Sequence, residues 1–266
     1  MSGSSIPNVL SIAGSDPSGG AGIQADLKTF AAHGVYGMAA ITALTAQNTQ
    51  GVRSVVNSPE RFVRDQIEAV FDDIEVSAVK IGMLSSAEII EAVADCLERY
   101  SPKHVVLDPV MIASSGDMLI DMDALSAMKK RLFPLASVIT PNIPEAEKLM
   151  RAAVLDMEFA AEKLLDLGVE AALLKGGHLK GDHCTDYLAY KGGVKSYSAE
   201  RIETENTHGT GCTLSSAIAA NLAKGLELAH AVAAAKDYLT EALRAADMLE
   251  VGAGHGPVNH NITSFS

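Results

Sequence analysis

A glycine-rich turn followed by an alanine-rich stretch is the part of this sequence best suited to chemistry. The turn reads His-Gly-Thr-Gly-Cys-Thr from residue 208 to residue 213 and runs into Leu214–Lys224. We predict that it opens a helix, because glycines let the backbone close around a ligand and the free N–H groups of a first helical turn favour an anion. Cys212 would then lie at the positive end of that helix, which lowers the pKa of a thiol. The segment indicates a phosphate cradle with a potential base inside it; the alternative is an ordinary helix start with Cys212 as a small buried side chain.

Oxygen-bearing side chains follow two other apolar runs. Asp108 comes at the end of one run, and Asn142 and Glu145 follow the next, three residues apart. Carboxylate and amide oxygens are ligands that Mg²⁺ accepts in proteins. Asn142 and Glu145 also suit the capping of a helix, which is the alternative for this pair. Taken with Asp108, they favour a magnesium site.

Three further segments carry candidate binding groups. The loop 14–22 reads Gly-Ser-Asp-Pro-Ser-Gly-Gly-Ala-Gly, which lacks both the Gly-Lys-Ser/Thr ending of a phosphate-binding P-loop and the dinucleotide fingerprint. It favours close backbone approach to a small ligand, although a flexible turn has the same composition. Gln47 can donate and accept, which suits the edge of an amino-substituted heteroaromatic ring, unless its segment is only a polar turn. Lys175 precedes Gly-Gly-His and can reach a nucleotide phosphate as a point charge, unless it is a solvated strand end.

The elements that must position these residues alternate between short apolar runs and helical patterns. Such alternation predicts an α/β fold with a mainly parallel sheet covered on both faces, in which ligands bind beyond the carboxyl ends of the strands. The expected strands are 9–13, 38–44, 78–83, 104–110, 137–140 and 171–175, with an antiparallel hairpin over 184–190 and 194–202. The expected helices are 22–32, 59–71, 87–100, 124–133, 145–150, 158–167, 213–224 and about 227–249.

Composition sets the class of protein. The 266 residues include 48% hydrophobic side chains, and no linker or repeat divides them, so we expect one domain over residues 1–266. A formal net charge of −12 disfavours nucleic acid and anionic lipid as partners. The three cysteines are far apart and indicate neither a disulfide framework nor a zinc site. Neither a signal peptide nor a membrane helix is expected, so the predicted location is the cytoplasm.

The ordered series of motifs resembles the ribokinase superfamily and, within it, the hydroxymethylpyrimidine and phosphohydroxymethylpyrimidine kinases of thiamine biosynthesis. The resemblance spans about residues 9–258. It implies ATP-dependent phosphorylation of 4-amino-5-hydroxymethyl-2-methylpyrimidine and then of its monophosphate, on a ribokinase-like fold. The matching segments are 13–26 (AGSDPSGGAGIQAD), 41–49 (ITALTAQNT), 80–84 (KIGML), 107–110 (LDPV), 140–146 (TPNIPEA), 175–178 (KGGH) and 206–213 (NTHGTGCT).

The resemblance also implies roles for individual residues. Gln47 would hydrogen-bond the pyrimidine edge, while Met83 and Val110 would form apolar walls. The substrate would also contact the glycine-rich loop, through Gly14, Asp16 and Ala21. Phosphate and ATP would be held by Lys175, Thr207, Gly209, Thr210, Gly211 and Cys212. Mg²⁺ would lie among Asp108, Asn142 and Glu145. Members of this family lead us to expect a homodimer, and a requirement for a monovalent cation stays open.

Many sugar kinases of the superfamily carry aspartate as the catalytic base where this chain has Cys212. We hypothesise that the Cys212 thiolate takes the proton from the substrate alcohol in the first step. In the second step the acceptor is already an anion, so charge neutralisation by groups such as Lys175 matters more. Two alternatives stay open at this stage, a pyridoxal or pyridoxine kinase on the same fold and a non-catalytic protein that binds a vitamin precursor.

Overall fold

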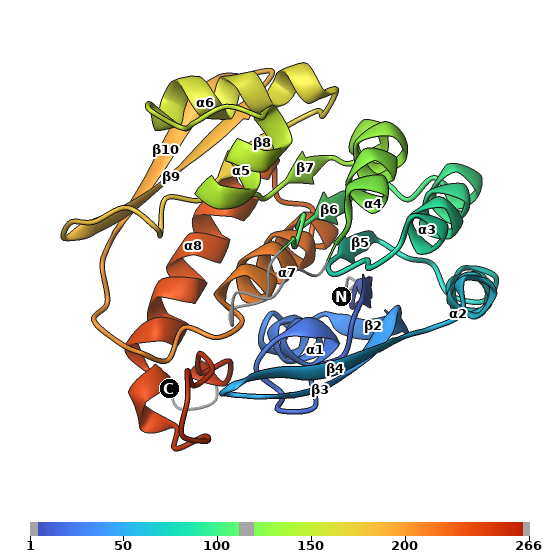
Figure 1. Cartoon of the computed structure of the whole chain (residues 1–266), viewed down its shortest axis with the longest axis horizontal. Helices are drawn as coiled ribbons and strands as arrows, with labels where there is room; N and C mark the ends of the chain where they lie inside the picture. The colour runs from blue at the N-terminus through green and yellow to red at the C-terminus, as the bar shows by residue number, and fades with distance from the viewer. Residues whose placement is uncertain (1–4, 112–119, 263–266) are drawn as a thin grey trace.

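The computed structural model describes residues 5–111 and 120–262, and its framework is an eight-stranded sheet between two layers of helices (Figure 1). Strand order is β10-β9-β8-β7-β6-β5-β1-β2, with β3 and β4 forming a separate two-stranded sheet. The strands are β1 (Asn8–Ala13), β2 (Tyr36–Ile41), β3 (Ala43–Asn48), β4 (Gly51–Asn57), β5 (Ala78–Ile81), β6 (Val105–Leu107), β7 (Val138–Ile139), β8 (Ala172–Leu174), β9 (His183–Tyr190) and β10 (Gly193–Glu200). The α-helices are α1 (Gly22–Ala32), α2 (Glu60–Phe71), α3 (Ala87–Tyr100), α4 (Met122–Ala127), α5 (Ile143–Met150), α6 (Met157–Leu164), α7 (Thr210–Ala223) and α8 (Leu228–Arg244).

The centre of the large sheet is parallel from β2 through β1, β5, β6 and β7 to β8. At one edge the pairings of β8 with β9 and of β9 with β10 are antiparallel, so β9 runs opposite to its neighbours. The central strands β5, β6 and β8 are short and buried on both faces, as expected for a sheet that helices cover on both sides. The predicted α/β fold with a mainly parallel sheet is confirmed.

Two apolar clusters fill the space between the sheet and its helix layers. Successive side chains of a strand point to opposite faces, so Leu10 and Ile12 of β1 join the cluster under α2–α6, whereas Val9 joins the cluster under α1, α7 and α8. The same alternation in β5 sends Val79 and Ile81 to the first face and leaves Lys80 on the face of Ala78. A lysine is therefore built into the layer that α1 and α7 cover.

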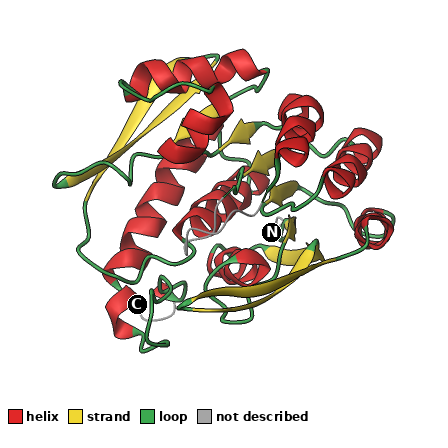
Figure 2. Cartoon of the chain, in the orientation of Figure 1, coloured by secondary structure: helices red, strands yellow, loops and turns green. Residues whose placement is uncertain are grey.

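The predicted strand 38–44 is wrong at its end, because the chain leaves the sheet at Thr42. The residues after Thr42 form β3, which pairs with β4 in an antiparallel ribbon beside the main sheet (Figure 2). Strand β4 was not predicted from the sequence. Thr42 N–H donates to the Ala13 carbonyl, and Ser58 N–H donates to the Thr42 carbonyl, which holds both ends of the ribbon at this point. Much of the ribbon is exposed, so its strands lack the apolar pattern of a buried strand.

The other predicted elements are found with small shifts of their ends. The helix 124–133 is shorter than expected, since α4 passes into a π turn at Met128–Leu132 and a 3₁₀ turn at Phe133–Leu135. The last helix ends at Arg244 rather than near Leu249, and a 3₁₀ turn follows it. The hairpin of β9 and β10 lies within one or two residues of the predicted ranges 184–190 and 194–202.

Candidate active site

A cavity of about 630 Å³ opens at the carboxyl edge of the parallel strands. It is bounded by segments that follow β1, β5, β6, β7 and β8 and by the first turn of α7. Every site residue predicted from the sequence lines it: Gly14, Asp16, Ala21, Gln47, Met83, Asp108, Val110, Asn142, Glu145, Lys175, Thr207, Gly209, Thr210, Gly211 and Cys212. Because parallel strands end at one edge, residues up to about two hundred positions apart in the chain meet here.

The turn before α7 has the geometry predicted for an anion cradle. Helix α7 begins at Thr210, and Gly209 caps it in the left-handed region with φ of 81°. A Cβ at Gly209 would overlap the carbonyl oxygen of Gly20, so glycine lets this turn press against the loop 14–22. A Cβ at Gly211 would lie 3.3 Å from both Asp108 Oδ2 and Lys175 Nζ, which shows how closely the helix start approaches these charges. The first turn of α7 therefore lines the cavity beside a lysine, where a helix start favours an anion.

Cys212 lies in the first turn of α7, as predicted, but its thiol does not have the expected acidity. Burial raises the pKa of Cys212 to about 11, and the nearby Lys80 ammonium only partly offsets this. The carboxylates of Asp26 and Asp108 add to the rise, while the Gly22 N–H opposes it. The prediction of a lowered thiol pKa is wrong for this structure, because removal from water outweighs the helix terminus.

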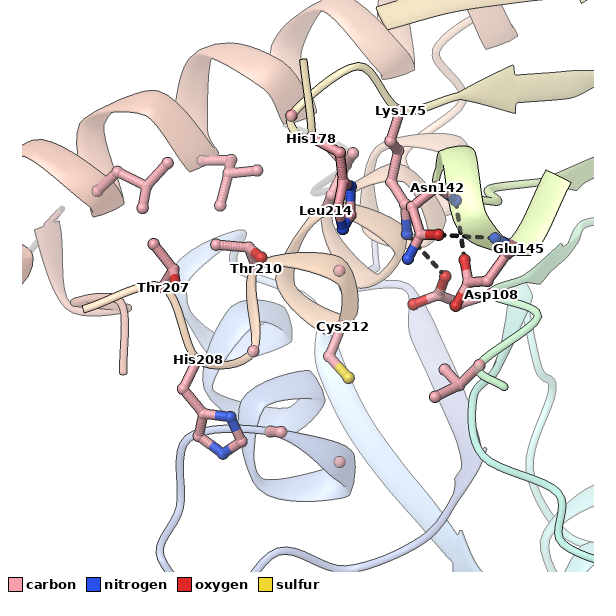
Figure 3. A pocket seen from close by; sticks show the side chains of 18 of the residues that line it. Asp108, Asn142, Glu145, Lys175, His178, Thr207, His208, Thr210, Cys212 and Leu214 are labelled. Atoms are coloured by element: carbon pink, nitrogen blue, oxygen red, sulfur yellow. Dashed lines mark hydrogen bonds and ion pairs between the residues drawn. The ribbon is translucent and has the colours of Figure 1, made fainter. Parts of the chain in front are cut away.

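Lys175 and Asp108 form an ion pair beside the helix start (Figure 3). Lys175 Nζ donates to Asp108 Oδ1 at 3.0 Å, and Thr140 Oγ1 donates to the same oxygen at 3.1 Å. Burial alone would disfavour the ammonium, but Asp108 and Glu145 outweigh it and raise the pKa of Lys175. Lys175 therefore keeps its positive charge and is not a solvated strand end.

Asn142 and Glu145 form the capping box of α5, the alternative that their spacing had left open. Asn142 Oδ1 accepts from the Glu145 N–H at 2.9 Å, and Glu145 Oε2 accepts from the Asn142 N–H at 2.8 Å. Burial raises the pKa of Glu145 to about 7; Lys175 lowers it and Asp108 raises it. The carboxyl groups of Asp108 and Glu145 are thus held close together out of water. A bound divalent cation would offset the repulsion between their negative charges.

Magnesium fits this corner of the cavity. Among residues 5–111 and 120–262, His, Cys, Asp and Glu form no group of three or more that could enclose a metal ion. Asp108 and Glu145 would therefore supply two oxygen donors and leave the other positions to water and phosphate, as is usual for Mg²⁺.

Asp16 organises the glycine-rich loop and directs its carboxylate into the protein. Its two oxygens accept from the N–H groups of Ser18, Gly20 and Ala21 at 2.8 to 3.2 Å, and Oδ2 also pairs with His208 Nε2 at 2.8 Å. Burial would raise the pKa of Asp16, but the hydrogen bonds from His208 and Ser18 lower it to about 2. Although Asp16 lines the cavity as expected, its carboxylate is used to shape the loop and tie it to the turn before α7.

His208 was not assigned a role from the sequence, although it belongs to the glycine-rich turn 208–213. Its Nε2 lies 3.4 Å from Gln47 Nε2 in addition to its contact with Asp16. Gln47 belongs to β3, and Thr45 Oγ1 contacts Gln47 Oε1 at 3.3 Å. The residue predicted to bind the ring edge is thus positioned by the ribbon and by a histidine from the opposite end of the chain.

The half of the cavity far from Gln47 was missed by sequence analysis. It is lined by side chains of the β9–β10 hairpin, the segment after it and helix α8, which carry no motif. Within it, Lys236 Nζ of α8 donates to Asp186 Oδ2 at 2.7 Å, and Asp186 Oδ1 accepts from the Gly176 N–H at 2.8 Å. Both side chains are largely buried, so the pair fixes the backbone directly after Lys175. The newly found lining residues are Asp186, Ala199, Glu200, Arg201, Ile202, Lys236, Leu239, Thr240 and Leu243.

Comparison with known proteins places this site in a family. The family model described as phosphomethylpyrimidine kinase matches residues 16–259. The chain belongs to the phosphomethylpyrimidine kinase family. A hydroxymethylpyrimidine/phosphomethylpyrimidine kinase of Rhizobium meliloti is 54% identical over 94% of this chain and 96% of its own. A thiamine biosynthesis bifunctional protein of Geobacter sulfurreducens is 53% identical over 95% of this chain, which matches 52% of that longer protein.

The fold is shared with another vitamin kinase. An ADP complex of Bacillus subtilis pyridoxal kinase superposes with a TM-score of 0.90, at 38% identity and with coverage of 98% of this chain and 100% of that one. The predicted ribokinase-like fold and the assignment to a kinase family are confirmed. In the described parts of the chain, no helix combines the length and apolar character needed to cross a bilayer.

Proposed function

We propose that this enzyme uses ATP to phosphorylate 4-amino-5-hydroxymethyl-2-methylpyrimidine and then phosphorylates the monophosphate to the diphosphate, in thiamine biosynthesis. The observation that carries the proposal is one cavity that is lined both by Gln47 and by the α7 cradle, Lys175 and Asp108. The structural similarity to a pyridoxal kinase supports the fold but does not identify the substrate. Pyridoxal and the pyrimidine both carry a hydroxymethyl group on a nitrogen heterocycle.

The ring would lie between the glycine-rich loop and two apolar side chains. Gly14 and Ala21 offer backbone at the cavity wall, and Met83 and Val110 offer apolar surface. A Cβ at Gly14 would lie 3.3 Å from the sulfur of Met83, so glycine preserves the width of this slot. Gln47 then pairs with the amino group and ring nitrogen at the edge of the heterocycle.

In the first step the hydroxymethyl oxygen attacks the γ-phosphorus of ATP. The new O–P bond forms as the bond between the γ-phosphorus and the β–γ bridging oxygen breaks, and ADP leaves with that oxygen. The alcohol proton passes to the sulfur of Cys212, which must be in its thiolate form. The amides of Gly209–Cys212 and the Lys175 ammonium stabilise the negative charge on the transferring phosphoryl group. Because burial keeps the thiol pKa near 11, this step should accelerate as pH rises through the neutral range.

In the second step the phosphate of the monophosphate attacks a second ATP. This acceptor is already ionised, so no base is required, and positioning and charge neutralisation by Lys175 and the α7 amides carry the reaction. When bound, Mg²⁺ would supply charge neutralisation for the ATP phosphates. We propose that Asp108 and Glu145 hold it, with Asn142 contributing chiefly by capping α5 and keeping Glu145 in place.

The adenosine part of ATP would occupy the far half of the cavity. Leu239 and Leu243 of α8 and Ile202 give that half an apolar wall, and Thr207 lies just before the phosphate cradle, which begins at Gly209. This placement puts the γ-phosphate at the helix start, where Lys175 and Cys212 lie.

The deciding experiment is a mass-spectrometric assay of the purified enzyme with Mg-ATP and the hydroxymethylpyrimidine, with pyridoxal in parallel. Sequential appearance of the mono- and diphosphate supports the two-step kinase. Phosphate on pyridoxal alone would move the enzyme to the branch of its Bacillus subtilis structural neighbour and would remove the role given to Gln47. Omitting Mg²⁺, and exchanging K⁺ for Na⁺, tests the two cation requirements in the same assay.

We further propose that residues 1–266 act as one cytoplasmic kinase domain that forms a homodimer. The ribbon supports a dimer because Leu44 and Val56 on it are exposed, as is Phe62 of the neighbouring α2. Light scattering after size exclusion tests the assembly, and cell fractionation tests the location.

A further inference from the structure

A charged cluster is buried directly beneath the catalytic end of the cavity. Asp26 of α1 accepts from Lys80 Nζ with both oxygens, at 2.8 and 2.9 Å. Ser11 Oγ of β1 donates to Asp26 Oδ2 at 2.6 Å, and Ser216 Oγ of α7 donates to Oδ1 at 2.7 Å. All four side chains are fully buried. The carboxylate is thus satisfied by four short hydrogen bonds from three elements other than its own.

The cluster lies one helical turn below the groups that line the site. Asp26 is four residues after Gly22 on α1, and Ser216 is four residues after Cys212 on α7, so each faces the same side of its helix one turn deeper. Lys80 itself lines the cavity from below, together with Gly22 and Cys212. The end of β5 keeps room for the ammonium, since a Cβ at Gly82 would lie 2.8 Å from Lys80 Nζ.

Stability alone does not account for such a pair. Moving two charges out of water costs several kcal/mol per ion, and apolar residues of similar size often replace a buried pair without loss. The surrounding layer is otherwise apolar, formed by residues such as Val9, Ala78 and Leu214. A charge that is retained at this depth and lines the same cavity as Cys212 therefore points to a role in the chemistry above it.

We propose that Lys80, held by Asp26 beneath the first turns of α1 and α7, is a positioning residue that stabilises negative charge on the sulfur of Cys212. The inference rests on the base role proposed for Cys212. It also explains how a thiol with a raised pKa can ionise during the alcohol step.

The charges around the sulfur have opposing effects that can be separated. Lys80 from β5 favours the thiolate and is the largest influence after burial, whereas Asp26 from α1 and Asp108 after β6 oppose it. Lys175, after β8, also interacts with the thiolate. At the Cys212 sulfur, the favourable effect of Lys80 therefore exceeds the unfavourable effect of its partner Asp26.

The test measures the charge on Cys212 without turnover, by the rate at which iodoacetamide alkylates it as a function of pH. Peptide mass spectrometry separates Cys212 from the buried Cys96 and the half-buried Cys184. Lys80→Met should slow alkylation about tenfold at pH 8 for each unit by which it raises the thiol pKa. The double variant Asp26→Asn/Lys80→Met should slow it less, because it also removes a carboxylate that opposes the thiolate. The matched control is Lys163→Met, which removes a lysine paired with Asp166 on the surface and should leave the profile unchanged.

Slower alkylation in both variants, by less in the double variant, supports the proposal. An unchanged or faster profile in Lys80→Met would overturn it and leave a structural ion pair. If Lys80→Met does not fold, the double variant Asp26→Asn/Lys80→Met, which buries no charge, replaces it; alkylation at the native rate would then refute the idea. A base role for Cys212 can fail independently, because that role is judged from turnover of the Cys212→Ala variant.

Discussion

The ion pair between Lys236 and Asp186 allows a quantitative test of how the fold holds Lys175 in place. Lys236 reaches Asp186 at 2.7 Å, and the two side chains are only 11% and 5% exposed. Removing one partner of a buried pair leaves an uncompensated charge, which costs about 3–5 kcal/mol. Lys236→Met should therefore lower the free energy of unfolding by about that amount, a large part of the stability of a typical domain.

Paired variants separate the charge from the hydrogen bond that reaches the active site. Asp186→Asn/Lys236→Met buries no charge and keeps an oxygen for the Gly176 N–H, so most of the stability should return. Asp186→Ala/Lys236→Met removes that acceptor as well, which costs about 1–3 kcal/mol more. Since Gly176 follows Lys175, only the alanine variant should also lower kcat.

Urea unfolding followed by circular dichroism suits this test, because the chain contains no tryptophan to report by fluorescence. Lys195→Met, which removes an exposed lysine of β10, is the control and should stay within about 0.5 kcal/mol of the native enzyme. A loss below about 1 kcal/mol in Lys236→Met would refute the reasoning, since it would mean that water reaches Asp186 and compensates the charge.

Three other predictions concern the cradle and its neighbours. Cys212→Ala should slow phosphorylation of the alcohol about 10²–10⁴-fold and that of the monophosphate much less, in single-turnover assays; equal losses would exclude a base. Glu145 binds its proton more tightly in the folded state, with a pKa of about 7 against an ordinary 4.5, so the free energy of unfolding should fall by up to about 3 kcal/mol as pH rises between these values. Urea unfolding curves at pH 5 and pH 7.5 should show this fall in the free energy of unfolding for the native enzyme and not for Glu145→Gln. Gly209→Ala should raise the KM for ATP and destabilise the fold, because its Cβ would meet the Gly20 carbonyl oxygen. As a control, Gly225 has a similar positive φ but open space around it, so Gly225→Ala should lower the free energy of unfolding by only about 1–2 kcal/mol and leave the KM unchanged.

The sequence by itself determined the fold class and most of the catalytic edge. Alternating apolar runs and helical patterns require a parallel sheet, and the carboxyl ends of parallel strands lie at one edge. That rule was enough to bring Asp108, Asn142 and Lys175 together with the turn at Gly209–Cys212, and all of them line one cavity. These placements depend on local signals, which a single sequence carries.

Only the tertiary structure decided the electrostatics and the outer boundary of the site. The acidity of Cys212 depends on burial and on Lys80 and Asp26, which lie more than a hundred residues away in sequence, so a motif at the helix start cannot predict it. Asp16 was expected to meet the substrate, but its carboxylate is taken up by its own loop and by His208. The far half of the cavity comes from a hairpin and a helix without motifs. In each case the deciding quantity is distance through space and exclusion of water, which the order of residues does not contain.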